Sequence, residues 1–311
     1  MDSARDFGAH TSAAVDPASD RVYVSYYDAT NGDLRLAQPA VGGSGNCGPD
    51  SSWSCETVDS TGDAGQYSSI AIWDGGGVWK LGIAYHRANN HSLRYAQYEK
   101  ASGPGKWTFT TIAAGSLADR HGLYTSLRFD STGAAHIAYY NETLAIQGQS
   151  PEGQNDSAVY ARYVGGGSGE CTDDDWDCQA IETGRGAGKF TSLDLNGSDE
   201  PRMAYYHADH SGLRYARYHG SDGNCGPDNT WQCETVDTAP KPGLVEGAGA
   251  GPHVSLRAGS GTMARIAYYD ALNDALKVTA YPVLLGPGNC GPGNTWRCTQ
   301  IETVGASEGP M

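Results

Sequence analysis

The amino-acid sequence predicts an all-β fold, and three observations support this prediction. A short apolar and aromatic run recurs five times along the 311 residues, and no copy has a helical period. Glycine (43 residues) and tyrosine (19) are abundant, as expected for many short strands joined by tight turns. No long stretch of the sequence has the pattern of a helix. The chain is therefore expected to consist of β-repeats.

The recurring run predicts the second strand of each repeat. Its copies are 21–28, 80–86, 135–141, 201–207 and 263–270. Most copies share Ile-Ala-Tyr-Tyr or a close variant, whereas the last residue reads Asp, His, Asn, His and Asp in turn. The shared part predicts scaffold, with the tyrosines packed between repeats, and the variable end predicts function.

Three further strands are expected around each copy. A first strand precedes it and begins at His10, Tyr67, Tyr124, Phe190 or His253. A third strand follows a short turn, as in Leu34–Ala37 and Leu213–Tyr218. A fourth strand begins at a tryptophan that recurs once in each repeat: Trp53, Trp107, Trp176, Trp231 and Trp296.

Five units of four antiparallel strands predict a five-bladed β-propeller, with a double sandwich of the same strands as the alternative. The expected blades are 9–60, 66–114, 122–184, 189–238 and 252–304, in a single domain that spans residues 1–311.

The eight cysteines predict local disulfides. They form four closely spaced pairs: Cys47/Cys55, Cys171/Cys178, Cys225/Cys233 and Cys290/Cys298. Zinc is the alternative, but the pairs lie in different repeats and lack histidines at ligand spacing. Each bridge would add about 2–3 kcal/mol through chain entropy. Four disulfides predict an oxidising compartment and a secreted, extracellular or periplasmic protein.

Charge and hydropathy narrow the choice of partners. A formal charge of −15 and a pI near 4.8 disfavour nucleic acid, which needs a basic surface. No apolar run reaches 18 residues, so no membrane span is expected. A monomer is expected.

Candidate functional residues gather at one mouth of the predicted channel. The start of a first strand and the end of the antiparallel second strand lie on the same side of a blade. The paired positions are His10/Asp28, Tyr67/His86, Tyr124/Asn141, Phe190/His207 and His253/Asp270. Arg120 and His121 precede Tyr124, and the long connections 142–156 and 237–251 are expected at the same mouth. Because the titratable residues differ between repeats, a single asymmetric site is predicted.

The repeat frame resembles a known group of propellers. Ser-Leu followed by an Asp, then Ala-Tyr-Tyr-Asp, then Leu-Arg-Tyr-Ala is similar to the Asp-box and BNR-type repeats of sialidase-like and lectin proteins, over nearly the whole chain. The His-rich runs 85–95 and 206–215 resemble turns of BNR-type ulvan lyases. These resemblances imply a propeller with a carbohydrate ligand.

Three functions remain open at this mouth. In a polysaccharide lyase, His86, His207, Tyr124, His10 and His253 would supply the base and the acid, while Arg120, Arg94 or Arg214 would hold a uronate carboxylate. In a metal site, His10, His86, His207 and His253 would bind a divalent ion such as zinc, manganese, copper or calcium. In a lectin or adhesion module, the same mouth would only bind glycans. The substrate-binding residues are expected to be Asp28, Asp270, Asn141, Tyr67, Phe190, Arg120 and His121. A purely structural role, such as a buried His10/Asp28 pair, is the alternative for each.

Overall fold

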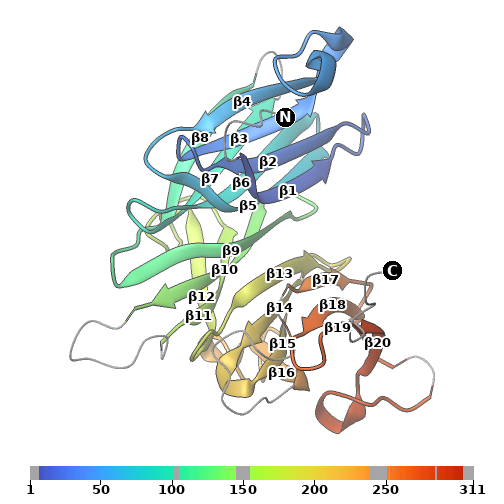
Figure 1. Cartoon of the computed structure of the whole chain (residues 1–311). Helices are drawn as coiled ribbons and strands as arrows, with labels where there is room; N and C mark the ends of the chain where they lie inside the picture. Colours follow the sequence, from blue (N-terminus) through green and yellow to red (C-terminus); the bar gives the residue numbers. More distant parts are fainter. Residues whose placement is uncertain are drawn as a thin grey trace, which may run out of the picture. The chain divides into compact units, whose positions relative to one another are not determined.

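The five predicted blades are present as five separate sheets. A computed structural model of the chain describes residues 7–100, 105–144, 155–238, 251, 253–283 and 286–303. Each of its five sheets has four antiparallel strands joined in sequence order (Figure 1). The predicted fold class, an all-β five-bladed propeller, is confirmed. Among the described residues, no helix is long and apolar enough to cross a membrane.

The chain divides into two compact units. Unit 1 comprises Met1–Gln149 and Tyr160–Cys178, and unit 2 comprises Ser150–Val159 and Gln179–Met311. Each is considered by itself below. A single propeller domain over the whole chain stays a prediction.

The first three sheets contain twelve strands. Sheet one is β1 (Phe7–Val15), β2 (Val22–Asp28), β3 (Asp33–Pro39) and β4 (Trp53–Asp59). Sheet two is β5 (Ala64–Gly75), β6 (Val78–Arg87), β7 (Ser92–Lys100) and β8 (Lys106–Ala113). Sheet three is β9 (Asp119–Phe129), β10 (Ala135–Thr143), β11 (Ser157–Tyr163) and β12 (Trp176–Thr183).

The last two sheets repeat the same order. Sheet four is β13 (Lys189–Leu195), β14 (Pro201–His207), β15 (Gly212–Tyr218) and β16 (Trp231–Thr238). Sheet five is β17 (Ser255–Ala258), β18 (Ala264–Asp270), β19 (Ala275–Tyr281) and β20 (Arg297–Thr303).

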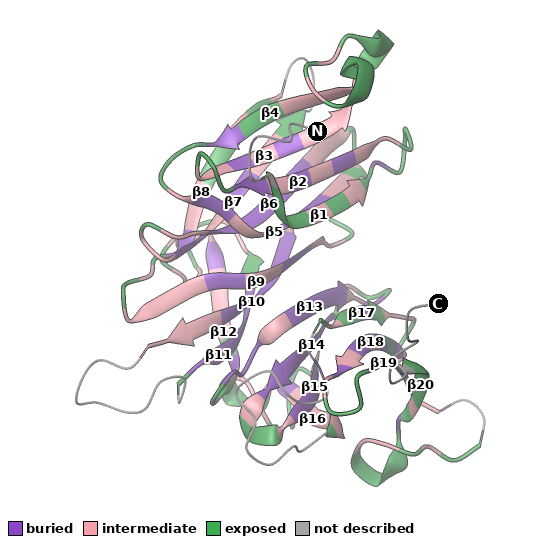
Figure 2. Cartoon of the chain, in the orientation of Figure 1, coloured by how far each residue is buried: buried purple, intermediate pink, exposed green. Residues whose placement is uncertain are grey.

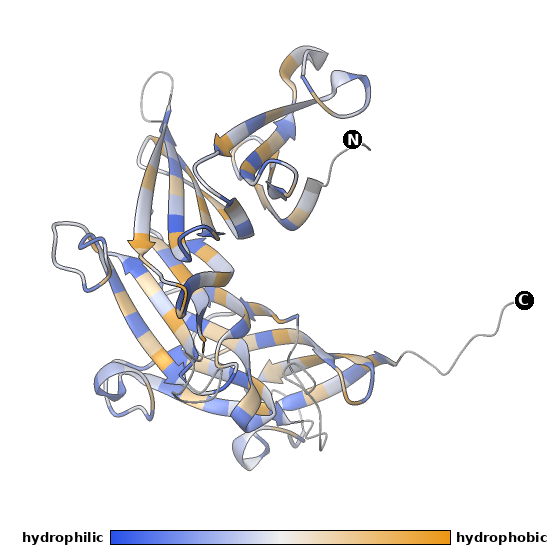
Figure 3. Ribbon diagram, turned by 60° about the vertical axis from the view of Figure 1, so that its left-hand side comes forward, coloured by the Kyte–Doolittle hydropathy of each residue, from blue (hydrophilic) through white to orange (hydrophobic). Residues whose placement is uncertain are grey.

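The core lies between the sheets. Apolar clusters lie between sheets one and two and between sheets four and five. Hydrophobic and hydrophilic residues are interleaved along the strands (Figure 3). The shared tyrosine of the second strand is buried in four sheets, as Tyr85, Tyr139, Tyr205 and Tyr268 (Figure 2). This burial matches the packing role predicted for the shared part of the run.

The predicted disulfides are present. Cys47–Cys55, Cys171–Cys178, Cys225–Cys233 and Cys290–Cys298 are all bonded, and no described cysteine is free. Each bridge joins the fourth strand to the loop that precedes it. Sheet two forms its fourth strand, β8, without a bridge, so the disulfides brace a hairpin that the strands can build alone.

Candidate functional site

The five predicted strand starts share an unusual backbone conformation. His10, Tyr67, Tyr124, Phe190 and His253 all have left-handed φ angles, between 51° and 58°. Such angles are costly for residues with a Cβ and cluster at ligand-binding and catalytic sites. The conformation recurs at one position of every sheet, so it is a property of the repeat.

A glycine two residues earlier accompanies each of these positions. Gly65 and Gly122, for example, have φ angles of 110° and 85°. A Cβ on Gly65 would lie 2.8 Å from Leu34 Cα, and one on Gly122 would lie 2.9 Å from Leu93 Cα. Gly65 and Gly122 therefore let β5 and β9 approach the third strand of the preceding sheet, whereas a Cβ on Gly8 would meet no atom within 4 Å. This Gly-x-(aromatic or His) spacing was readable in the sequence, but our sequence analysis missed it.

The backbone carbonyl groups of the left-handed residues also accept hydrogen bonds from the first strand of the next sheet. Ser68 Oγ–H donates to the His10 carbonyl at 2.8 Å, and the Thr125 hydroxyl donates to the Tyr67 carbonyl. The backbone at these positions therefore belongs to the scaffold. The side chains it presents are left to vary.

In unit 1 these side chains form a continuous row of rings. The centroids of His10 and Tyr67 lie 4.3 Å apart, and those of Tyr67 and Tyr124 lie 4.8 Å apart. His10 is exposed, and the two tyrosines are half-buried. We call His10, Tyr67 and Tyr124 the ring wall. In unit 2, Phe190 and His253 make the corresponding contact at 5.1 Å.

The two aspartates at second-strand ends cap turns. Asp28 accepts the backbone N–H groups of Thr30 and Asn31 at 3.0 and 3.2 Å. Asp270 accepts those of Leu272 and Asn273, and its Oδ2 lies 2.6 Å from Lys277 Nζ. Both aspartates are fully buried. These contacts give Asp28 and Asp270 a structural role, and their predicted role in binding substrate stays a prediction.

His86 has a defined tautomer. Its Nδ1 lies 2.6 Å from the His121 carbonyl oxygen, which can only accept, so Nδ1 carries the proton and Nε2 carries the lone pair. Burial lowers the pKa of His86 to about 4, which keeps the ring neutral at pH 7. His91 stacks beside it, with centroids 6.2 Å apart.

His207 has a similar environment in unit 2. It is buried, and burial lowers its pKa to about 4. His210 meets its ring edge-on at a centroid distance of 4.6 Å. The ring packs so closely on Gly184 that a Cβ there would lie 2.7 Å from His207 Cε1.

His121 lies in a chain of hydrogen bonds. Its Nε2 is 3.1 Å from Asp119 Oδ2, and its Nδ1 is 3.4 Å from the Tyr139 hydroxyl. The bond from His121 lowers the pKa of Asp119. Asn141 contributes a further side-chain hydrogen bond to Asp119. His121 and Asn141 therefore belong to one polar cluster on β9 and β10 of sheet three.

Arg120 is ion-paired beside the ring wall. Its Nη1 lies 3.1 Å from Glu142 Oε2, and both side chains reach solvent. Glu142 is also close enough to Tyr124 to raise the pKa of that phenol, second to the effect of burial. Glu142 was missed in the sequence analysis because it stands outside the repeated frame.

The other arginines predicted to hold a carboxylate are buried in ion pairs. Arg94 Nε lies 3.5 Å from Asp59 Oδ2. Arg214 donates from Nε to Glu182 at 2.9 Å and makes a second bond to the same carboxylate. Neither guanidinium is placed to receive a uronate group.

The proposed metal ligands do not form a metal-binding group within a described part of the chain. Among the described residues, no three His, Cys, Asp or Glu side chains are grouped to hold an ion. The segments 145–154 and 239–250, the middle of the two long connections expected at the mouth, lie outside the described residues.

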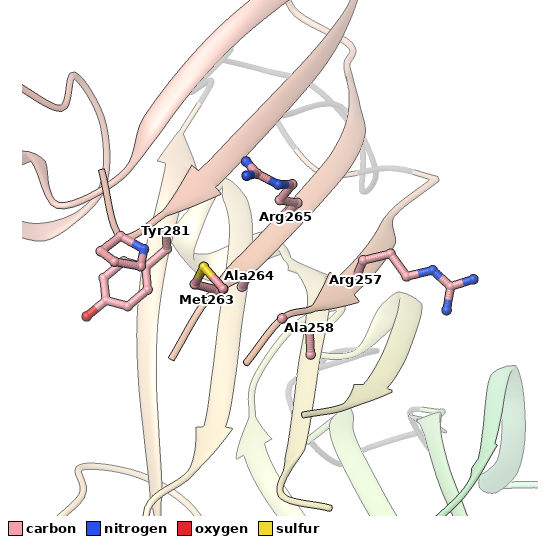
Figure 4. A pocket seen from close by; sticks show the side chains of 8 residues that line it. Arg257, Ala258, Met263, Ala264, Arg265 and Tyr281 are labelled. Atoms are coloured by element: carbon pink, nitrogen blue, oxygen red, sulfur yellow. The ribbon is translucent and has the colours of Figure 1, made fainter. Parts of the chain in front are cut away.

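One pocket of about 240 Å³ lies in sheet five, lined by residues that include Arg257, Met263, Arg265 and Tyr281. Figure 4 shows the Arg257 side chain extending away from Met263 and Tyr281. The pocket is at the end of β17 and the start of β18, the strand ends opposite His253 and Asp270. It is separate from the predicted mouth.

Comparisons with known proteins find only distant structural similarities. The sequence matches no family model and no curated protein. A fucose-specific lectin from Aleuria aurantia is 12% identical, with a TM-score of 0.49 over 96% of this chain and 79% of the lectin. An α-L-arabinofuranosidase from Fusarium graminearum is 12% identical (TM-score 0.42, 81% of this chain, 67% of that one). A polysaccharide lyase is also 12% identical (TM-score 0.40, 95% and 69%). Similarities this low do not bear on ligand or activity.

Proposed function

We propose that the protein is secreted and binds a carbohydrate against the ring wall of unit 1. The continuous contact from His10 through Tyr67 to Tyr124, at 4.3 and 4.8 Å, carries this proposal. Aromatic faces bury large apolar areas beside a polar hydroxyl, which suits the mixed surface of a sugar ring. The four disulfides support export.

The backbone supports a binding role for these rings. Three side chains are held in left-handed conformations, each at a cost of about 1–3 kcal/mol. The rings are therefore positioned before a ligand arrives, which reduces the entropy lost on binding. The Arg120–Glu142 pair adds charged hydrogen-bonding groups beside Tyr124.

The test is binding of the purified protein to a panel of immobilised glycans. Tyr67→Ala removes the central ring, and loss of such an aromatic anchor should weaken binding by about 30-fold. Tyr67→Phe keeps the ring and should retain most of the affinity. Tyr218→Ala is the matched control, because Tyr218 is exposed at the end of the third strand β15, in unit 2. Unchanged binding by a folded Tyr67→Ala variant would contradict the proposal.

A polysaccharide lyase is the second candidate, and His86 favours it. A neutral imidazole with Nδ1–H anchored to a carbonyl carries its lone pair on Nε2, which is the form that a general base needs. Incubation with uronate polymers would then release unsaturated products that absorb in the ultraviolet, and His86→Gln would abolish that signal. If the wild-type protein gives no absorbance change on polymers that it binds, the lyase is excluded for them.

A further inference from the structure

The arginines around the ring wall already have partners. Four described arginines of unit 1 lie at the strand ends nearest the ring wall, near the starts of β3, β7 and β9 and at the end of β6: Arg35, Arg94, Arg120 and Arg87. Two of them pair with carboxylates, Arg94 with Asp59 at 3.5 Å and Arg120 with Glu142 at 3.1 Å. A ligand carboxylate would have to displace one of these internal acids.

The remaining two donate to neutral acceptors. Arg35 Nη1 donates to Thr57 Oγ1 at 2.9 Å, and Arg87 Nε donates to Asn90 Oδ1 at 2.8 Å. Thr57 lies on β4 and Asn90 in the β6–β7 turn, so both bonds tie the arginines to their own sheets. Recognition of a carboxylate usually takes a bidentate arginine, and these bonds occupy part of each guanidinium.

The wall itself carries no positive charge at neutral pH. Partial desolvation by its neighbours lowers the pKa of His10, and burial raises that of Tyr124, so both side chains are neutral. Carboxylates lie close by: Glu142 influences Tyr124, and Asp63 accepts the Tyr27 hydroxyl at 2.5 Å, with Tyr27 6.1 Å from the His10 ring. The chain as a whole has a charge of −15, which repels polyanions before contact.

We propose that the ligand of the ring wall is a neutral saccharide, without carboxylate or sulfate groups. The proposal rests on the proposed carbohydrate-binding function and narrows its ligand class. Sugar hydroxyls donate to the carboxylate of Glu142, and the apolar ring face packs on Tyr67 and Tyr124. Charge-assisted bonds of this kind need no cation from the protein.

The test compares polymers that differ only in their carboxyl groups. Polygalacturonate, alginate and a glucuronan are each immobilised in native form and after chemical reduction of the carboxyl groups to alcohols, beside a panel of neutral polysaccharides. Neutral members should bind, and any reduced uronate polymer that binds should do so at least about tenfold more tightly than its native form.

The variant Glu142→Ala tests whether the acid paired with Arg120 excludes acidic ligands. Removing this acid releases Arg120, so affinity for the native uronate polymers should rise by about tenfold while binding to neutral glycans weakens. Glu99→Ala is the matched control. It removes the same charge from an exposed position at the far end of β7 and should change neither affinity.

The outcomes separate the two proposals. Wild-type protein that binds native uronate polymers as tightly as their reduced forms overturns the neutral-ligand proposal, and loss of that binding in Arg87→Ala would identify the cation responsible. Protein that binds no member of any class overturns the carbohydrate-binding function itself.

Discussion

Two junctions within unit 1 show how the repeats diverge. Between sheets one and two, the Tyr85 hydroxyl donates to Asp59 Oδ2 at 2.5 Å, and Arg94 lies 3.5 Å from the same oxygen. At the junction of sheets two and three, the equivalent Tyr139 hydroxyl instead meets the His121 imidazole, which in turn contacts Asp119, and all three residues belong to sheet three. We call the first arrangement the acid–tyrosine–base lock.

The lock also occurs twice in unit 2. Glu182 accepts from Tyr205 at 2.5 Å and from Arg214, whose bonds lower the glutamate's pKa although burial raises it. Asp237 accepts from Tyr268 at 2.5 Å and from Lys277 at 3.0 Å. In each case the acid ends a fourth strand, and the tyrosine and base come from the next sheet.

At the junction between sheets two and three, neither the acid nor the base of the lock is present. Ala113 occupies the acid position on β8, and Val159 occupies the base position on β11. His121 lies three residues before Tyr124, where the equivalent positions before Tyr67 and Phe190 are the small residues Ala64 and Ala187. A buried tyrosine hydroxyl needs a partner, and here a rim histidine provides it. The junction without the lock is thus the one at which a series of hydrogen-bonded titratable groups, Tyr139, His121 and Asp119, extends to solvent.

The largest expected effect comes from breaking the lock. Asp59→Ala leaves the Tyr85 hydroxyl and the Arg94 guanidinium, both largely buried, without an anionic partner. The free energy of unfolding should fall by about 3 kcal/mol. Urea denaturation measures the change, and Asp59→Asn should recover part of it by keeping an acceptor for Tyr85. A loss below about 0.5 kcal/mol would show that the lock contributes no more to stability than an exposed ion pair does.

Acidification should reveal the buried histidines. The pKa of His86 and of His207 is about 4 in the folded protein, against 6.5 when unperturbed. The unfolded chain therefore binds more protons between these values, and stability is lost as pH falls from about 6.5 to about 4. Melting temperatures across this range should drop less in His86→Gln than in wild type. His219→Gln, at an exposed histidine, should follow the wild-type curve.

The His121 contacts should contribute less to the free energy of unfolding than the acid–tyrosine–base lock does. His121→Ala removes the partner of the Tyr139 hydroxyl, but no buried ion pair is broken. A loss of about 1–2 kcal/mol is expected, smaller than for Asp59→Ala. The comparison of the two variants in the same denaturant series decides the point. If His121→Ala lowers the free energy of unfolding more than Asp59→Ala does, the contacts of His121 stabilise the protein more than the lock does.

The smallest effect on stability is expected at the rim ion pair. Arg120 and Glu142 are partly exposed, so Glu142→Gln should change the free energy of unfolding by no more than about 0.5 kcal/mol. Urea denaturation would check this. A large loss would mean that Glu142 holds the structure of the mouth, and its effect on ligand binding would then need a different explanation.

The sequence by itself determined the repeat, the strand order and the disulfides. These follow from local signals: the recurring Ala-Tyr-Tyr run, the turn residues after it, and cysteine pairs seven or eight residues apart. The same comparison of copies singled out His10, Tyr67 and Tyr124, because they share one position at the strand starts.

Only the tertiary structure decided what those residues touch. The sequence comparison aligned His86 with Asp28, but the strand register places His86 opposite Leu93, as Tyr27 lies opposite Leu34. The Asp28 carboxylate is used by its own turn, and the His86 imidazole is held by a carbonyl of the next sheet. Arg94 and Arg214 looked available in the sequence but are bound to acids of the preceding sheet. A strand pattern specifies which face a side chain occupies, whereas its hydrogen-bond partner depends on the sheet packed against that face.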